Sequence, residues 1–194
     1  MLPAGDVPNA AAMHRRLDAA AEEVPQLEGV SGELHAIYDA FAAAGSQVRL
    51  QRIHGDLHLG QTLRTSSRWL VIDFEGEPMA TLADRRRPES ALRDIAGMLR
   101  SFEYAGHHRI IEVGFAPQLA YRADEWTVRN REAFLAGYAE AAGHDPREHP
   151  VPLRAFEADK AVYEAVYEAR NRPAWLPIPL ASLARLAANG KDSS

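Results

Sequence analysis

The residues best suited to chemistry lie between positions 54 and 76. This stretch reads HGDLHLGQ, then TLRTSSRW, then LVIDFEG. Asp56 stands in a tight polar turn, and Asp73 stands at the end of the apolar run 70–72. Such a run predicts a buried strand, which would hold Asp73 rigidly at its end. We therefore expect a turn to position Asp56 and a strand to position Asp73.

The spacing within this stretch suits phosphoryl transfer. Asp56 and Gln61 are separated by four residues, as are the catalytic Asp and the metal-binding Asn of the kinase catalytic loop. Phosphoryl transfer needs a carboxylate that orients the attacking hydroxyl and takes its proton, and Asp56 suits this task. It also needs hard oxygen ligands for Mg²⁺, and Gln61 and Asp73 suit that one.

Longer segments resemble a known family. HGDLHLGQ followed by IDFEGEP resembles the aminoglycoside-phosphotransferase-like kinases, which are similar to the C-terminal lobe of protein kinases. Residues 86–105 and 159–180 resemble bacterial maltokinases, some of which are fused behind trehalose synthase. The resemblance covers the chain from about residue 14 onward. It implies a transferase of trehalose and glycogen metabolism that uses ATP and Mg²⁺ to convert maltose to maltose 1-phosphate.

The long helix expected over residues 151–170 is where the resemblance places the sugar. Its helical wheel has a small apolar face of alanines, a charged face and an aromatic face. Ordinary half-buried packing would also explain the tyrosines. The resemblance favours sugar recognition, with aromatic rings stacked on the pyranose and charged groups on its hydroxyls. The expected substrate-binding residues are His54, Lys160, Glu164, Tyr167 and Trp175.

The charges of this helix favour a neutral substrate. Lys160, Arg170 and Arg172 dilute the negative charge of Glu164 and Glu168. An acidic pocket would instead favour a cationic ligand. The sequence therefore predicts a neutral sugar such as maltose.

Two further residues are expected to support the loop. His58 should shape it by hydrogen bonds, although His54, Asp56 and His58 at alternate positions could also bind a transition metal. The resemblance implies that Asp94 anchors the loop backbone, while the plainer alternative is an exposed charge. Glu75 stands where that family has glycine, and it could join the metal shell or face solvent.

Composition excludes several classes of protein. The chain has 194 residues, a formal net charge of −5 and no cysteine. These values show no nucleic-acid footprint and exclude disulfides and thiolate metal sites. No apolar run approaches the length of a membrane span, and residues 1–17 lack the apolar core of a signal peptide. We therefore expect a cytoplasmic protein without a membrane segment.

The expected fold is mainly α with a small β-hairpin, an α+β arrangement like a kinase C-terminal lobe. That lobe should span residues 10–188, between flexible tails at 1–9 and 189–194. No phosphate-covering Gly-x-Gly-x-x-Gly and no strand lysine precede residue 54, so the N-terminal lobe is expected to be absent. A separate polypeptide or a fused trehalose synthase could then be a partner.

Two alternatives to a maltokinase remain open. One is another small-molecule kinase, of the aminoglycoside or choline type. The other is a lobe that binds a sugar or a partner without catalysis, because the groups that grip ATP are missing.

Local patterns predict the individual elements. A hairpin should pair residues 61–64 with 69–72, and a short strand should cover 48–53. A charged loop is expected at 81–87 and an extended segment at 173–179, while 106–117 stays unassigned. Helices are expected at 10–24, 31–44 with Ser31 as N-cap, 124–142, 151–170 and 180–188, and from Pro88 with a buried stripe of Leu92, Ile95, Leu99 and Phe102.

Overall fold

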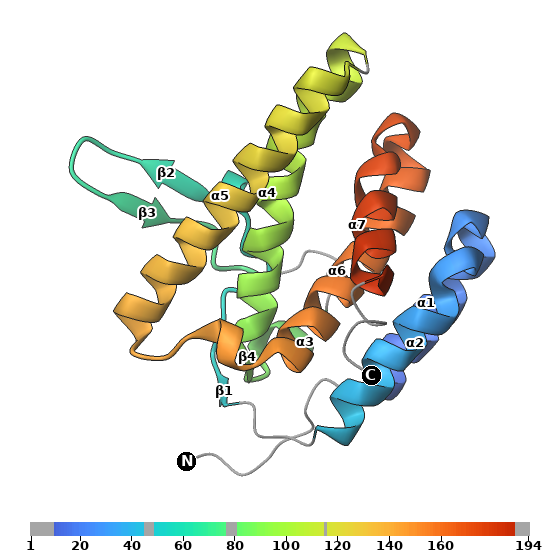
Figure 1. Ribbon diagram of the computed structural model, residues 1–194. Coiled ribbons are helices and arrows are strands. Elements are labelled where there is room, and N and C mark those ends of the chain that lie inside the picture. Colours follow the sequence, from blue (N-terminus) through green and yellow to red (C-terminus); the bar gives the residue numbers. More distant parts are fainter. Residues whose placement is uncertain (1–9, 45–48, 77–80, 115, 189–194) are drawn as a thin grey trace.

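The computed structural model describes residues 10–44, 49–76, 81–114 and 116–188. It is mainly helical, with two small antiparallel sheets (Figure 1), which confirms the predicted secondary-structure class. The predicted tails at 1–9 and 189–194 lie outside the described residues. The main helices are α1 (Ala10–Glu23), α2 (Glu28–Ala43), α4 (Ala91–Val113), α5 (Pro117–Ala142), α6 (Pro150–Asn171) and α7 (Pro177–Ala188).

Helix α6 is the centre of the packing. It contacts α4 on one side and α1, α2 and α7 on the other. Ala158, Ala161 and Ala165 are fully buried on it, and such small side chains let neighbouring helices approach closely. The predicted stripe of α4 is buried as well, at Leu92, Ile95, Leu99 and Phe102. The apolar periodicity of both helices was therefore predicted correctly.

The predicted hairpin is present as β2 (Thr62–Arg64) and β3 (Trp69–Val71). Thr62 pairs with Val71, and Arg64 pairs with Trp69. The turn closes where Thr65 N donates to Arg68 O at 2.8 Å. The hairpin projects away from the helices (Figure 1). The second sheet pairs β1 (Leu50–Gln51) with β4 (Glu89–Ser90), so the strand expected at 48–53 is shorter than predicted.

Several predicted helix boundaries were wrong. α2 begins at Glu28, so Ser31 lies inside the helix and does not cap it. α4 begins after Ser90, whose hydroxyl accepts from Leu92 N at 3.1 Å, and not at Pro88. A serine side chain can cap the first turn in this way, whereas proline can only fit it.

Prolines also misled the prediction near the C-terminus. The segment expected to be extended at 173–179 forms the 3₁₀ turn η4 (Pro173–Trp175) and the first residues of α7. Pro173, Pro177 and Pro117 each stand in a first helical turn, a position that proline favours. The charged loop at 81–87 contains the short helix α3 (Leu82–Arg86).

Two glutamates of the predicted charged face of α6 are buried. Glu157 and Glu168 are only 5% and 1% exposed. Arg131 donates to Glu157 at 2.8 Å, and Arg172 donates to Glu168 at 2.9 and 2.6 Å. Burial raises the pKa of Glu157, against the lowering effect of Arg131. The charges of α6 therefore hold neighbouring segments together.

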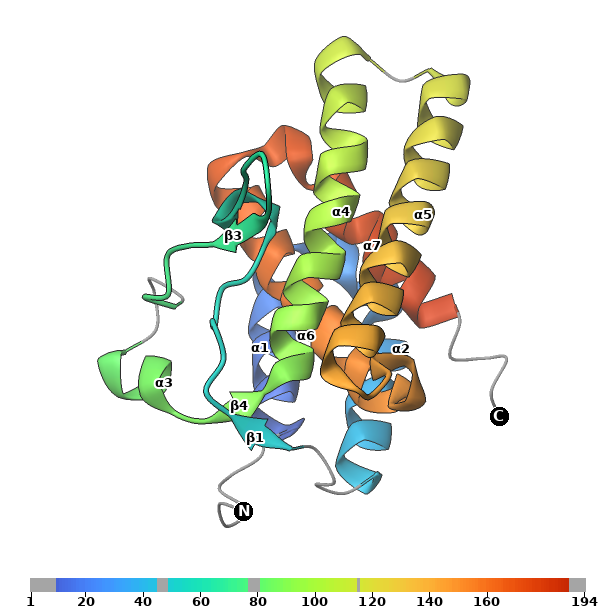
Figure 2. The same ribbon diagram turned by 90° about the vertical axis from the view of Figure 1, so that its left-hand side faces the viewer.

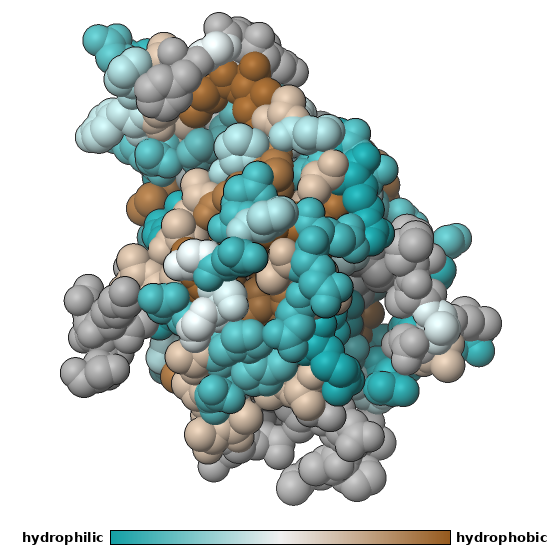
Figure 3. Space-filling view, turned by 90° about the vertical axis from the view of Figure 1, so that its right-hand side faces the viewer, coloured by the Kyte–Doolittle hydropathy of each residue, from teal (hydrophilic) through white to brown (hydrophobic). Residues whose placement is uncertain are grey.

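The outer surface is mostly polar where α1 and α7 lie. Figure 3 shows a largely hydrophilic face with scattered apolar residues. On this side Arg16 of α1 forms a paired contact with Asp159 of α6, at 2.9 and 2.6 Å. Among the helices described, none combines the length and the hydropathy needed to cross a bilayer.

Candidate active site

The loop that carries Asp56 is docked along α4. Figure 2 shows the segment that follows β1 running beside this helix. Asp94 accepts two backbone hydrogen bonds from it, from His54 N at 2.7 Å and from Gly55 N at 2.9 Å. Burial raises the pKa of Asp94, while the two amide hydrogen bonds lower it. Asp94 therefore holds the backbone at the start of the loop.

Two further residues of α4 complete this docking surface. A Cβ at Gly97 would lie 2.6 Å from Leu57 O, so only glycine allows the loop to approach so closely. Ser101 Oγ accepts from Leu59 N at 3.1 Å. Sequence reasoning missed both residues. Their spacing of three and seven positions from Asp94 places all three on one helix face, which was a usable signal.

Asp56 lies against α6. Its Oδ1 is 3.2 Å from Lys160 Nζ, and both side chains are partly exposed, at 20% and 27%. Lys160 comes from a segment more than one hundred positions away. The fold thus brings the predicted base together with one predicted substrate-binding residue and leaves the carboxylate accessible.

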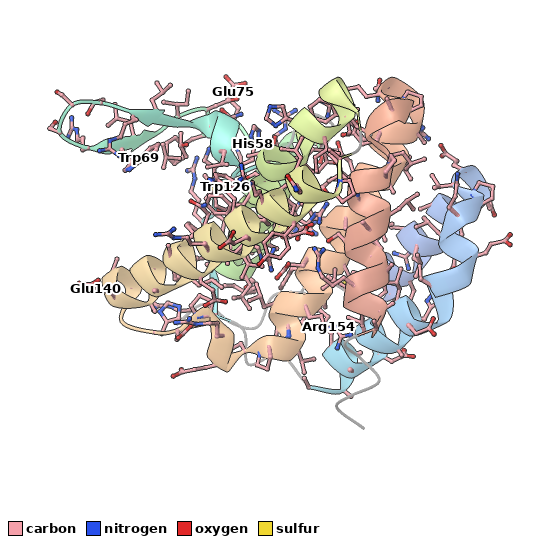
Figure 4. The ribbon with its side chains drawn as sticks, turned by 45° about the horizontal axis from the view of Figure 1, so that its top comes forward. His58, Trp69, Glu75, Trp126, Glu140 and Arg154 are labelled. Atoms are coloured by element: carbon pink, nitrogen blue, oxygen red, sulfur yellow. The ribbon has the colours of Figure 1, made fainter. Side chains whose placement is uncertain are left out.

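The two loop histidines stabilise the local conformation. His54 is buried, its Nε2 lies 2.8 Å from Ile72 O, and its Nδ1 accepts from Asp56 N at 3.4 Å. His58 Nδ1 accepts from Gly60 N at 3.1 Å and caps the turn η2 (Leu59–Gln61). His58 lies beside the helices near the base of the hairpin (Figure 4). Because both ring nitrogens of His54 bond within the protein, its contacts are those of a supporting residue.

Gln61 and Asp73 meet across the base of the hairpin. Gln61 Nε2 donates to Asp73 Oδ2 at 2.8 Å, so the amide oxygen and the other carboxylate oxygen take no part in this bond. Asp73 has a φ of 63°, in the left-handed region. In the described ranges no three His, Cys, Asp or Glu side chains gather to hold a metal. Mg²⁺ often takes only one or two carboxylates and completes its shell with phosphates and water, so this pair fits it.

The strand before Asp73 is not buried, contrary to the prediction. Val71 and Ile72 are 43% and 37% exposed, and Phe74 is 64% exposed. Alternating and continuous apolar patterns indicate that a strand forms, but they do not show whether other parts of the protein cover its faces. Glu75 is exposed as well (Figure 4).

Glu164 is oriented by a buried arginine. Arg100 Nε donates to Glu164 Oε2 at 2.8 Å, and Arg100 has no exposed surface. Burial raises the pKa of Glu164, while Arg100 and then Lys160 lower it. Arg100 also pairs with the buried Glu103 of α4. Sequence reasoning missed Arg100 because nothing local marks an arginine as buried.

The two aromatic residues predicted to bind the sugar, Tyr167 and Trp175, both lie close to Arg172. Its guanidinium lies 5.4 Å from the Tyr167 ring centroid and 4.5 Å from that of Trp175. The rings of Tyr104 and Trp175 are 6.1 Å apart. Tyr167 is 43% exposed. The fold therefore brings Tyr167 and Trp175 close to one cation, that of Arg172.

The cations named in the charge argument for a neutral substrate all form ion pairs, and only one of them, Arg170, pairs away from the active-site face of α6. Arg170 pairs with Glu23 of α1, where its Nε donates at 2.8 Å, and Arg172 pairs with Glu168. Lys160 pairs with Asp56. Arg172 therefore neutralises Glu168, and Lys160 lowers the pKa of Glu164, whereas Arg170 acts on an acid outside α6.

Comparison with known proteins identifies similar sequences. No protein-family model matches the chain. A glucosamine kinase of Mycolicibacterium smegmatis is 33% identical over 180 residues, which covers 91% of this chain and 42% of that protein. A glucosamine kinase of Streptacidiphilus jiangxiensis is 28% identical over 185 residues, covering 90% and 41%. The chain spans less than half the length of the curated relatives it matches.

Solved structures show the same fold. Glucosamine kinase in crystal form B matches with a TM-score of 0.79 and 25% identity, over 91% of this chain and 45% of that one. Glucosamine kinase in complex with glucosamine, ADP and inorganic phosphate matches with a TM-score of 0.82 and 24% identity. That match covers 94% of this chain and 47% of the other.

These findings correct the family prediction. The relatives and structural neighbours are glucosamine kinases, so the prediction of a maltokinase or an aminoglycoside-phosphotransferase-like kinase was wrong. The predictions of maltose as the substrate and of a role in trehalose and glycogen metabolism were based on the same resemblance and are not supported either. The names of the relatives include neither a trehalose synthase nor a partner polypeptide. The segments behind the resemblance, 86–105 and 159–180, form most of α4 and α6 with η4, whose structural roles do not specify a sugar.

Proposed function

We propose that this chain phosphorylates glucosamine or a closely related amino sugar with ATP, and that it carries the base, the metal ligands and the sugar contacts. The observation that carries the proposal is the similarity to glucosamine kinases over about nine-tenths of the chain. One solved neighbour holds glucosamine, ADP and inorganic phosphate, which supports ATP as the phosphoryl donor. The proposal corresponds to one of the two alternatives to a maltokinase, namely another small-molecule kinase.

The proposed base is Asp56. Its carboxylate is accessible, and the loop beneath it is fixed to α4 by Asp94, Gly97 and Ser101. Such a carboxylate can accept the proton of the attacking sugar hydroxyl and orient that hydroxyl. Lys160 Nζ, 3.2 Å from Asp56 Oδ1, holds this carboxylate in place.

The proposed metal ligands are Gln61 and Asp73. Their remaining oxygen atoms are the hard donors that Mg²⁺ prefers. When bound, the ion would neutralise charge on the phosphates of ATP. The hydrogen bond between the two side chains holds the amide and the carboxylate close together before any ligand arrives.

The proposed sugar contacts come from α6 and η4. Lys160 and Glu164 stand one turn apart on α6, and Arg100 holds Glu164 in one orientation. Tyr167 and Trp175 offer aromatic surface at the C-terminal end of the helix.

The test measures ADP release and ligand binding on the same preparation. Glucosamine, glucose, N-acetylglucosamine and maltose are each supplied with Mg²⁺ and ATP, and binding of each sugar is followed by calorimetry. We expect glucosamine to give the highest turnover. Asp56→Asn should lower kcat by about a thousandfold with sugar binding retained, because it removes the proton acceptor. Asp145→Asn, at a site paired with Arg147 outside the candidate active site, is the matched control.

Three outcomes separate the alternatives. Preference for a sugar without an amino group would overturn the substrate. Near-normal turnover by Asp56→Asn would overturn the catalytic assignment. Glucosamine binding without any turnover by the wild-type chain would favour a sugar-binding lobe without catalysis.

A further inference from the structure

A pocket outside the proposed active site lies on the side of α4 that faces α5. Its floor is apolar and buried, made by Leu92 and Ile95 of α4, which are 7% and 2% exposed. Its rim comes from β1, the end of α5 and the segment after α5. The full lining consists of Arg49, Gln51, Ser90, Ala91, Leu92, Ile95, Tyr138, His144 and His149.

The polar lining is cationic or hydrogen-bond donating. It includes one guanidinium, two imidazoles, a phenol and a buried hydroxyl, and none of the lining residues is an acid. Within the described ranges, the guanidinium of Arg49 has no hydrogen-bond or ion-pair partner. Two arginines near the pocket do have carboxylate partners. Arg93 pairs with Glu89, and Arg147 pairs with Asp145. An arginine without a carboxylate beside a partly apolar pocket is suited to an anionic ligand.

Two hydroxyl groups can add hydrogen bonds. Ser90 is 1% exposed, and its oxygen accepts from Leu92 N, which leaves its own proton without an acceptor among the described residues. Burial and then Asp94 raise the pKa of Tyr138, so its phenol stays protonated and able to donate. The Tyr138 ring is held edge-on by His144, with 5.7 Å between the ring centroids.

We infer that this pocket binds a small organic anion, namely a carboxylate on a flat or branched apolar body. The carboxylate would meet Arg49 and the donor groups of the rim, and the body would cover Leu92 and Ile95. The site is distinct from the proposed active site, since it shares none of the residues assigned to base, metal or sugar.

The pocket also touches the parts that hold the catalytic loop. Gln51 lies three positions before His54, and Ile95 directly follows Asp94. A ligand that fixes β1 against α4 would therefore stabilise the hydrogen bonds from His54 N and Gly55 N to Asp94. The occupied pocket would make the loop less mobile.

The test uses benzoate as the anionic probe and benzamide as its uncharged isostere. Binding to the whole chain is measured by ligand-observed NMR titration, with inorganic phosphate as a competitor. We expect benzoate to bind at least tenfold more tightly than benzamide, and Arg49→Gln to reduce benzoate affinity at least tenfold. Arg129→Gln, an exposed arginine of α5 outside the pocket, should change nothing. Circular dichroism verifies that both variants are folded.

Each opposite result overturns a stated part of the inference. Equal binding of benzamide and benzoate, no benzoate binding, or full binding by Arg49→Gln would overturn the anion site. Displacement of benzoate by phosphate at equal concentration would overturn the need for an apolar body. Hydrogen exchange at the amides of His54 and Gly55 should slow with benzoate, and unchanged exchange would overturn the link to the loop.

Discussion

The loop that carries Asp56 and the hairpin that leads to Asp73 are held in very different ways. The loop lies against α4 and is fixed there at Asp94, Gly97 and Ser101. The hairpin projects from the helices (Figure 4). Its Trp69 is 60% exposed, and Phe74, which follows the hairpin, is 64% exposed. The described residues therefore fix the proposed base firmly, whereas they hold the proposed metal-binding end mainly through the contacts of His54 and Gln61.

This difference shows that the chain positions the proposed base more firmly than the proposed metal ligand Asp73. Catalytic groups need support from packed residues around them to keep a productive geometry. Asp56 has that support, from α4 beneath the loop and from Lys160 beside it. Asp73 has a left-handed backbone and an exposed approach strand. Substitutions in the two regions should consequently have very different effects.

The largest effect is expected from Asp94→Ala. This change leaves the partly buried amides of His54 and Gly55 without their acceptor and should lower the free energy of unfolding by about 3 kcal/mol. Urea unfolding measures it. The control is Asp124→Ala, because Asp124 also accepts a hydrogen bond, from His107, but is 64% exposed. A loss at Asp94 no greater than at Asp124 would show that the loop is not anchored there.

The same residue predicts a pH dependence of stability. Burial raises the pKa of Asp94 above its ordinary value of 3.8, so the folded protein keeps this proton where the unfolded chain has lost it. The contribution of Asp94 is then fully present below pH 3.8 and decreases as the pH rises through the raised pKa. The difference in unfolding free energy between wild type and Asp94→Ala should therefore shrink from pH 4 to pH 7. Parallel pH profiles would contradict this.

A smaller effect is expected from Gly97→Ala. The new methyl group would meet Leu57 O at 2.6 Å and push the loop away, at a cost of about 1–3 kcal/mol. The matched control is Gly137→Ala on α5, where no atom lies within 4 Å. That exposed change should stabilise the protein by up to about 1 kcal/mol, because alanine is the better helix former. Thermal unfolding of both variants checks the opposite signs.

The smallest effect is expected in the hairpin. Trp69→Thr removes a ring that is 60% exposed and contacts the guanidinium of Arg64 at 5.1 Å. The unfolding free energy should fall by less than about 1 kcal/mol. A loss above 2 kcal/mol, on the order of a core substitution, would show that the hairpin is packed in solution and would remove the contrast between the two regions.

Much of the fold could be predicted because local patterns decide it. The stripe Leu92 to Phe102 and the alanine face of α6 follow helical periodicity, and both are buried as predicted. The hairpin follows from two short apolar runs around a polar turn. The errors in predicting helices near the C-terminus arose because proline is found both in extended segments and in the first turn of helices. Pro173 and Pro177 start helical turns in this fold, although proline suits an extended chain equally well.

The candidate site could be predicted only in part. The spacing of Asp56, Gln61 and Asp73 is visible in the sequence, and in the fold Gln61 meets Asp73. The roles proposed for them await the experiments above. Gly97 and Arg100 were missed because a helical glycine and a helical arginine have no local signature of close approach or burial. Maltose was predicted from a family resemblance that the glucosamine kinase relatives contradict, and ion pairs between distant segments, such as Arg170 with Glu23, were not visible in the sequence.

The sequence by itself determined the elements and the chemically capable side chains, because periodicity and turn chemistry act over a few residues. Tertiary structure alone decided which of these side chains meet. It placed Lys160 against Asp56 across one hundred and four positions, and it buried Arg100 between two glutamates. It also left Val71 and Ile72 exposed although their sequence reads as a buried strand. Burial and ion pairing depend on which surfaces the whole chain brings together, and no local pattern contains that information.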